Sequence, residues 1–160
     1  MCVTLPPFQR FLADHGDAMW RLCAASVGRE EADDAYQEAA LAALRAYPRL
    51  RAGSNLRAWA LTIAHRKALD VHRARARRPV AVGAVDDERP PAAAPPEPEP
   101  DDALWDAVRA LPPGQRAALT LRYAGDLQPA EVAAALRITP EAARRRIADG
   151  LARLREEYRP

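Results

Sequence analysis

The 160-residue sequence predicts an all-α protein built from two small helical domains and a flexible linker. Alanine, leucine, arginine and glutamate dominate the composition and β-branched residues are sparse, which favours helices over strands. Apolar residues recur at spacings of three and four along most of the chain, the period of an amphipathic helix. A single proline-rich stretch interrupts this pattern, and it divides the chain into residues 1–78, a linker at 79–102 and residues 103–160.

The linker is expected to be extended and mobile. Its sequence, with Arg78 in front, is RPVAVGAVDDERPPAAAPPEPEPDD, which contains seven prolines in 25 residues and almost nothing large to bury. Such a segment does not recover its ordering entropy through burial, and each residue before a proline is biased away from helix. We therefore expect a flexible acidic connection between the domains.

The first domain is expected to contain three main helices. Apolar residues from Phe8 to Val27 mark the first helix. The second begins within REEADDAYQEAALAALRAY, where early acidic residues suit the positive end of the helix dipole, and Pro48 closes it. After the loop PRLRAGSN, Ser54 or Asn55 caps a third helix. The residues expected to form the buried stripe of the second helix are Tyr36, Ala40, Ala43, Leu44 and Tyr47.

The second domain is expected to contain four helices that end in a helix-turn-helix. Leu104, Val108 and Leu111 mark its first helix, and the sequence PPG breaks it at residues 112–114. The short helix in QPAEVAAAL, the turn RIT and a basic final helix then follow. In a helix-turn-helix the second helix enters the major groove of DNA, although the same spacing also occurs in helical hairpins that bind nothing.

The final helix contains three adjacent arginines within ITPEAARRRIADGLARLR, residues 138–155. Thr139 suits the N-cap and Pro140 the first helical position. At about 100° per residue, one face of this helix must turn toward the core. The residues on that buried face are Ala143, Ile147, Gly150, Leu151 and Leu154.

Helical phase gives the three arginines different roles. Arg145 lies opposite the buried face and is expected to contact a base edge, for example guanine. Arg144 and Arg146 flank it and are expected to contact phosphates on either wall of the groove. A solvated arginine face is the alternative. Asp149, one turn beyond Arg145, is unfavourable for DNA and is expected to pair with that arginine instead.

A second basic cluster lies at the end of the third helix, in RKALDVHRARARR, with six Lys/Arg in 13 residues. Arg66, Arg73 and Arg77 fall near one face, two turns after Trp59. An arginine-rich helix beside an aromatic side chain holds phosphates and stacks an unpaired base. For Trp59 the favoured interpretation is a core anchor, with a stacking platform as the alternative.

Charge is segregated along the chain although the net charge is only +2. Residues 1–78 carry 13 Lys/Arg against 8 Asp/Glu, a net charge of +5, and residues 103–160 carry 10 against 7, a net charge of +3. Residues 79–102 carry 1 against 7, a net charge of −6. Two basic domains around an acidic linker indicate polyanion contact at both ends, with solvated helix faces as the alternative.

Nothing in the sequence indicates an enzyme. Asp33, Asp34 and Glu38 have no histidine nearby, and acidic residues are common at helix starts. His65 and His72 share a face but lack a third ligand, so we expect ordinary surface residues. The scattered glycines form no phosphate-binding loop, and no nucleophile stands beside a base. We expect no catalytic residue, no metal and no cofactor.

The sequence also favours a cytoplasmic location. No apolar run approaches the ~18 residues of a membrane span, and no signal peptide is found at the start. Cys2 and Cys23 form neither a disulfide framework nor a zinc pattern. A reduced protein without membrane insertion is therefore expected.

Three motifs, in this order, resemble those of the small extracytoplasmic-function (ECF) group of sigma-70 class bacterial RNA polymerase sigma factors. The segment similar to the family's polymerase-binding helix is ADDAYQEAALAAL. The segment similar to its −10 helix is SNLRAWALTIAHRKALDVHRARARR, and the −35 domain resembles LWDAVRALPPGQRAALTLRYAGDLQPAEVAAALRITPEAARRRIADGLARLR. The resemblance implies a region 2-like domain at 1–78, a linker at 79–102 and a region 4-like helix-turn-helix domain at 103–160.

The resemblance also implies partners and contact residues. The partners are core RNA polymerase, through its β′ clamp helices and β flap, promoter DNA and an anti-sigma factor. Clamp-helix contacts are implied for Ala32, Asp33, Asp34, Gln37, Glu38 and Leu41. Contacts to the −10 element, where the loop 49–55 would hold a flipped-out base, are implied for Arg49, Arg51, Ser54, Asn55, Trp59, Arg66, Lys67, Arg73 and Arg77. Contacts to the −35 element are implied for Thr139, Glu141, Ala142, Arg144, Arg145 and Arg146.

The chain departs from the family pattern at positions that affect promoter preference. Arg66 stands where the family usually has asparagine. Residues 142–146 read AARRR where Thr-Val and a lysine-serine-arginine run are usual, and Asp149 stands where a basic residue is common.

The sequence is also compatible with two functions other than that of a sigma factor. One is a free-standing helix-turn-helix regulator whose first domain senses or dimerises, and the other is a helical adaptor that binds only proteins. The long linker favours the sigma factor, because a disordered connection suits two distant DNA elements better than a rigid dimeric repressor.

Overall fold

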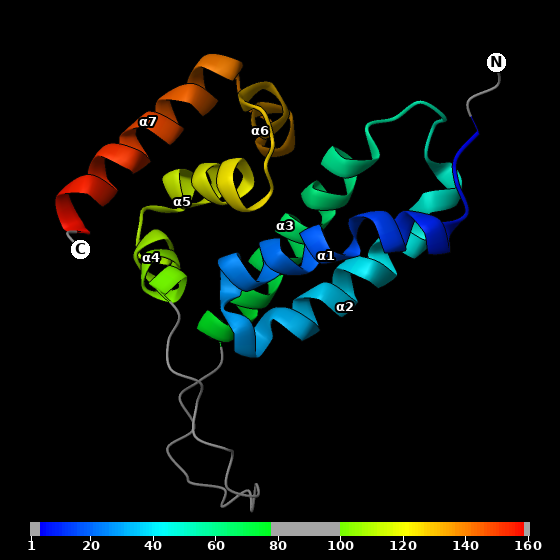
Figure 1. The fold of residues 1–160 in the computed structure, drawn as a ribbon, viewed down its shortest axis with the longest axis horizontal. Coiled ribbons are helices and arrows are strands. Elements are labelled where there is room, and N and C mark those ends of the chain that lie inside the picture. Colours follow the sequence, from blue (N-terminus) through cyan, green and yellow to red (C-terminus); the bar gives the residue numbers. More distant parts are fainter. Residues whose placement is uncertain (1–3, 78–99, 159–160) are drawn as a thin grey trace, which may run out of the picture.

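The computed structural model describes residues 4–77 and 100–158, and the expected flexible linker falls largely outside these ranges. Every regular element in the described ranges is a helix, which confirms the all-α fold (Figure 1). None of these helices is long and apolar enough to cross a membrane.

The first domain consists of α1 (Phe8–Val27), α2 (Arg29–Ala46), the short 3₁₀ helix η1 (Tyr47–Arg49) and α3 (Leu56–Arg77). Gly28 joins α1 to α2 with a φ of 88°, a backbone conformation that glycine adopts without steric cost. The three expected main helices are therefore all present.

Alanines allow α2 to pack closely against α1 and α3. The fully buried residues of α2 are Ala32, Ala35, Ala39 and Ala43. Leu44, which the sequence placed on the buried stripe, is instead 49% exposed. Its position one residue beyond Ala43 turns it by about 100° away from the alanine row. The prediction was wrong because the small residues, and not the large one, face the neighbouring helices.

The second domain consists of α4 (Pro100–Arg109), α5 (Pro113–Leu119), the π-helical turn η2 (Thr120–Ala124), α6 (Pro129–Leu136) and α7 (Pro140–Glu157). Helix α4 begins inside the stretch assigned to the linker, because proline is tolerated at the first helical position. Gly150 lets α7 approach α5, since a Cβ there would lie 2.9 Å from Leu119 Cδ1.

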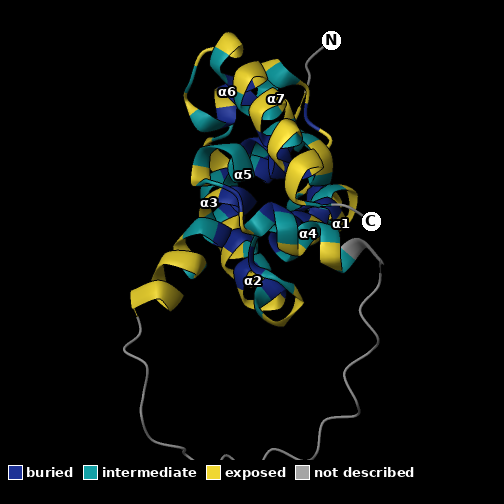
Figure 2. Cartoon of the chain, turned by 90° about the vertical axis from the view of Figure 1, so that its left-hand side faces the viewer, coloured by how far each residue is buried: buried dark blue, intermediate teal, exposed yellow. Residues whose placement is uncertain are grey.

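The two domains pack against each other, which the sequence did not predict. One hydrophobic cluster runs through both, joining Leu61 of α3 to Leu121, Leu127 and Val132. Helix α1 contacts η2 and α4, and α3 contacts α6. The buried residues form a continuous band through the centre of the molecule (Figure 2). A smaller cluster of Val108, Leu111, Leu119 and Leu154 completes the second domain.

Candidate protein- and nucleic-acid-binding surfaces

Helix α2 presents an outward ridge of acidic and apolar residues. Asp33, Asp34, Gln37, Glu38 and Leu41 are all exposed, opposite the buried alanines. Ala32, which the family resemblance also placed among the docking positions, is fully buried and faces the core. The ridge therefore contains five of the six expected residues.

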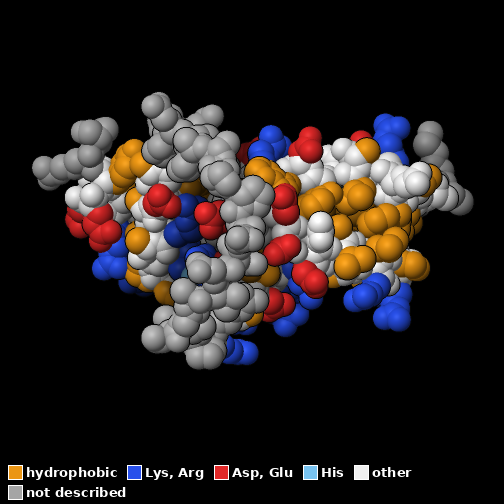
Figure 3. All heavy atoms as spheres, turned by 90° about the horizontal axis from the view of Figure 1, so that it is seen from below, with side chains coloured by type: hydrophobic (Ala, Val, Ile, Leu, Met, Phe, Trp, Pro, Cys, Tyr) orange, Lys and Arg blue, Asp and Glu red, His pale blue; other side chains and the backbone are white. Residues whose placement is uncertain are grey.

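Sequence reasoning missed one member of this ridge, Leu44. Leu41 and Leu44 are 47% and 49% exposed, and they lie one helical turn apart. Figure 3 shows hydrophobic side chains gathered next to acidic ones on the underside of the first domain. The continued alanine row at positions 32, 35, 39 and 43 was the signal that could have placed Leu44 outside.

Asp33 at the edge of this ridge is held by a residue from another helix. Trp20 Nε1 of α1 donates a hydrogen bond to Asp33 Oδ1 at 2.8 Å. A second interaction ties the start of α2 to the end of α3, between Arg75 and Glu31 at 2.9 Å. Both contacts fix the orientation of α2 relative to its neighbours.

The loop before α3 brings together four of the expected −10 residues. Arg49, Arg51 and Asn55 are exposed. Ser54 is half-buried, and its hydroxyl donates a hydrogen bond to the Arg51 carbonyl at 2.7 Å. Asn55 caps α3, because its Oδ1 accepts from the Ala58 amide at 3.0 Å. The alternative cap, Ser54, is thereby excluded.

Trp59 lies in an aromatic cluster beneath this loop. Its ring meets Phe11 edge-on at a centroid distance of 5.5 Å and Tyr47 at 6.1 Å. Phe8 joins through contacts of 5.5 Å to Phe11 and 5.3 Å to Tyr47. Such packing supports Trp59 as a core anchor.

The remaining expected −10 residues lie along α3. Arg66, Arg73 and Arg77 are exposed, and Lys67 is half-buried with an ion pair to Asp70 at 3.9 Å. Within the described residues, Arg66, Arg73 and Arg77 form no ion pair, so this basic face is open to a polyanion.

His65 on the same helix is not a surface residue as expected. It is 5% exposed, and neither ring nitrogen has a hydrogen-bond partner within the described residues. Burial, together with the charges of Arg66 and Arg116, lowers the pKa of His65 to about 4. His72 is exposed, as expected.

The phase of α7 agrees with the prediction. Ala143, Gly150 and Leu154 are buried, and Thr139 Oγ1 caps the helix by accepting from the Ala142 amide at 3.1 Å. Glu141 is exposed at the start of the helix, beside half-buried Ala142. The N-terminal end of α7 is thus free to contact a partner.

The three arginines of α7 occupy three environments. Arg145 is the outward one, with an 85% exposed side chain that pairs with Asp149 at 3.9 Å. Arg144 is also exposed. Arg146 is half-buried and lies over α5, where its Nε would be 3.3 Å from a Cβ at Gly114. The pair with Asp149 is solvent-exposed and readily exchanged for a stronger partner.

Neither a reactive thiol nor a metal cluster is found in the described part of the chain. Cys23 is fully buried, and burial raises the pKa of its thiol to about 12. No group of three or more histidine, cysteine, aspartate or glutamate residues there is placed to hold a metal ion.

Comparison with protein families assigns both domains. The family model for Sigma-70 region 2 matches residues 11–78, and the model for Sigma-70, region 4 matches residues 101–154. The chain belongs to the sigma-70 family of sigma factors. Its two matched regions, 2 and 4, are the architecture of the ECF group.

Solved structures share the fold of this sigma factor. One is CnrH in complex with the cytosolic domain of CnrY, with a TM-score of 0.70 and 22% identity over 93% of this chain and 85% of that chain. Another is the sigma factor RpoE of Bartonella quintana in complex with the anti-sigma factor NepR. It has a TM-score of 0.73 and 20% sequence identity, and the match covers 95% of this chain and 96% of that chain. Comparison with curated proteins found no match.

Sigma factors bind core RNA polymerase and direct it to promoters, and this defines the function of the chain as a transcription initiation factor. The free-standing helix-turn-helix regulator is not favoured, because region 2 accompanies region 4 in the same chain.

Proposed function

We propose that this sigma factor binds the β′ clamp helices of core polymerase through the outward ridge of α2. The supporting observation is the pair of exposed leucines, Leu41 and Leu44, beside the carboxylates of Asp34 and Glu38. Exposed apolar side chains with a charged rim are typical of a protein-binding surface. The acidic rim selects a basic partner helix.

The −10 element is proposed to contact the loop 49–55 and α3. The loop offers two exposed guanidinium groups and an asparagine amide, which suit the pairing edge and phosphates of an unpaired nucleotide. Arg66, Arg73 and Arg77 then contact the backbone beyond it. Trp59 contributes by anchoring the loop to the core and not by stacking a base.

The −35 element is proposed to receive the N-terminal end of α7. Arg145 is the base reader because it points away from the domain, and Arg144 contacts a phosphate on the groove wall. Arg146 contributes less to DNA binding, because its side chain already packs on α5. Thr139, Glu141 and Ala142 border the groove at the start of the helix.

The other proposed assignments follow from this role. We propose that residues 1–78 bind core polymerase and the −10 element. Residues 103–160 bind the −35 element and the β flap, and residues 79–102 connect these two domains. An anti-sigma partner is proposed because the structurally similar RpoE was solved with NepR. The protein acts by binding and not by catalysis, in the cytoplasm where its polymerase is found.

Co-purification with core polymerase tests the proposal. Bacterial core enzyme would be mixed with the full chain, passed over a sizing column, and the complex used to select sequences from a random double-stranded DNA library. We expect co-elution and selected sequences that share two separated elements. Selection of one element by the chain alone, without co-elution, would instead favour the helix-turn-helix regulator.

A further inference from the structure

The turn between α6 and α7 contains an arginine in a backbone conformation that suits glycine. Arg137 has a φ of 55° and a ψ of 46°, in the left-handed region. In that region the Cβ of an L-residue lies too close to the following carbonyl oxygen, so only glycine adopts it freely. Elsewhere in the described chain, positive φ angles belong to Gly28, Gly53 and Asp126, and aspartate is one of the few other residues that tolerate the conformation. Arg137 is therefore the exception.

The hydrogen bonds of the turn require this conformation. The Arg137 amide donates to the Ala134 carbonyl at 3.3 Å, and the Ile138 amide donates to the Ala133 carbonyl at 3.0 Å. This pair of bonds is a Schellman motif, which ends a helix by turning one residue into the left-handed region. Ile138 then packs against the central hydrophobic cluster. The fold thus demands the conformation but not the arginine, and glycine would adopt it with less strain.

Helix α6 is also fixed at its other end. Glu131 Oε2 accepts from the Gln128 amide at 2.7 Å and so caps the helix, while Glu131 Oε1 accepts from Asn55 Nδ2 at 2.7 Å. Because α6 is held at its start by these bonds and at its end by the Schellman motif, the turn has a defined place beside the start of α7 (Figure 1). The backbone at Arg137 is therefore positioned before any partner binds.

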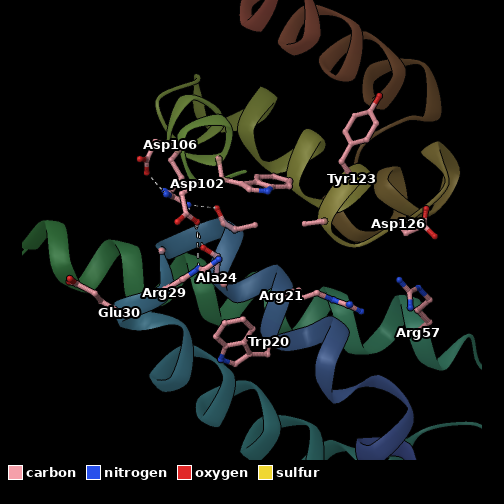
Figure 4. Close-up of a pocket in the computed structure, with 15 residues that line it drawn as sticks. Trp20, Arg21, Ala24, Arg29, Glu30, Arg57, Asp102, Asp106, Tyr123 and Asp126 are labelled. Atoms are coloured by element: carbon pink, nitrogen blue, oxygen red, sulfur yellow. Dashed lines mark hydrogen bonds and ion pairs between the residues drawn. The ribbon is translucent and has the colours of Figure 1, made fainter. Parts of the chain in front are cut away.

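The side chain of Arg137 has no partner within the described part of the chain. It is exposed, and no described residue forms an ion pair or a hydrogen bond with its guanidinium group. Arginines around the cleft of about 820 Å³ between the domains differ in this respect (Figure 4). Arg29 pairs with Asp102 at 3.5 Å, and Arg57 donates to the Gly125 carbonyl at 2.8 Å. Stability of the free protein does not explain a strained arginine whose charge is unused.

The neighbouring residues make this end of α7 basic. Between positions 137 and 146 the chain carries four arginines against one glutamate, a net charge of +3. Thr139 and Glu141, at the start of α7, are exposed beside the turn. A helix seated in a major groove has a phosphate backbone on either side of it, so a guanidinium group on the turn that leads into such a helix suits a phosphate.

We infer that Arg137 is a further contact of the −35 element, which holds a backbone phosphate where the DNA passes the start of α7. The strained conformation is kept by arginine because of this contact, as strain is at many binding sites. The inference rests on the proposed role of α7, and it adds a residue that the family resemblance does not imply. A phosphate contact of this kind positions the helix in the groove and carries no sequence preference.

Replacement of Arg137 by glycine should move stability and DNA binding in opposite directions. Arg137→Gly relieves the left-handed strain, so the unfolded population of the full chain at a given urea concentration should fall several-fold. The urea midpoint, followed by circular dichroism, measures this change. A midpoint lower than that of the parent chain would overturn the claim that arginine is strained at this position.

The DNA contact is tested with the complex of core polymerase and the full chain, titrated at several salt concentrations with a duplex carrying the selected −35 element. Arg137→Gly should weaken binding several-fold at low salt, equally for selected and base-substituted duplexes. It should also reduce the slope of the logarithm of the binding constant against the logarithm of salt concentration by about one. Arg137→Lys keeps the charge and should keep the slope of the parent.

Arg153→Ala is the matched control for this titration. Arg153 is also exposed on α7, but it lies toward the far end of the helix and pairs with Glu157 at 3.8 Å, so its loss should leave affinity and slope unchanged. Unchanged affinity and slope in Arg137→Gly, or a slope in Arg137→Lys as low as that in Arg137→Gly, would overturn the phosphate contact. So would weaker binding of Arg137→Gly to core polymerase without DNA, which would assign the residue to a protein partner.

Failure of the proposed −35 role would appear differently. The parent complex would then show no preference for the selected −35 sequence, and Arg145→Ala would have no effect on duplex binding. The urea midpoint of Arg137→Gly would still report the strain at the turn, so the two failures are distinguishable.

Discussion

Arg144, Arg145 and Arg146 are consecutive in the chain, and the structure gives each a different contact. Arg145→Ala should remove a bidentate base contact and cost about 1 to 3 kcal/mol of binding to the −35 element. Arg144→Ala should weaken binding equally for all DNA sequences. It should also reduce the slope of the logarithm of the binding constant against the logarithm of salt concentration by about one, because one phosphate contact is lost. Both are measured by titrating the polymerase complex with selected and base-substituted promoters.

Arg146→Ala is the matched control for these two variants, because its side chain lies over α5. Its effect on DNA affinity should be the smallest of the three. The assignment of α7 would be wrong if Arg145→Ala kept its −35 selectivity while Arg144→Ala lost it.

Asp149 is expected to affect the affinity of α7 for promoter DNA. Its carboxylate pairs with Arg145 in the free protein and would lie close to DNA phosphates in the complex. Asp149→Asn should therefore raise affinity for promoter DNA, most strongly at low salt, since a like charge is removed. An unchanged affinity at low salt would show that Asp149 lies outside the DNA contact.

Helix α2 is proposed to bind core polymerase through the exposed side chains of its outward ridge. Leu41→Ser and Leu44→Ser should each weaken core-polymerase binding by about 1 to 2 kcal/mol, because each leucine loses apolar burial at the proposed interface. Tyr123→Ser is the matched control, since Tyr123 is also exposed, at 53%, but lies in the second domain. Equal loss in all three variants, measured by competition with a labelled sigma factor, would refute the assignment of the ridge.

The periodicity of apolar residues was sufficient to predict the main helices and the outward face of α7, because one amphipathic stripe fixes the phase of a helix. It failed at Leu44, where the neighbouring helices approach so closely that only alanines fit between them. The sequence placed Asn55 correctly among the loop residues, since a polar N-cap before an apolar run is a local signal. Its bond to Glu131, 76 residues away, depends on the packing of the domains and has no local signal.

His65 is buried where α3 meets the second domain. The small cavity beside it is lined by His72 from α3, Ser26 from α1, and Arg116 and Thr120 from the α5–η2 segment. Burial with Arg66 and Arg116 nearby keeps the ring neutral, which the sequence did not reveal because nothing indicated that the domains touch.

Stability should fall in mild acid because of this histidine. The unfolded chain binds a proton near pH 6.5 and the folded chain only near pH 4, so the unfolding free energy falls as pH drops through this window and levels off below it. At 1.36 kcal/mol per pKa unit, the full effect is at most about 3 kcal/mol. His65→Leu should flatten the dependence, measured by urea unfolding at pH 7 and pH 5.

A residual slope is expected in that variant from His15, whose pKa burial also lowers. Identical slopes in the parent and His65→Leu chains would contradict the burial of a neutral histidine at the domain interface.

Transcription by core polymerase supplied with the full chain is the decisive measurement of sigma-factor function. The template would carry a selected two-element promoter, and the 5′ ends of the transcripts would be mapped. We expect one start downstream of the −10 element, and this start should be lost when Asp34→Lys and Glu38→Lys reverse the charge of the α2 ridge. Undiminished transcription by that double variant, or no promoter-dependent start with the parent chain, would contradict it.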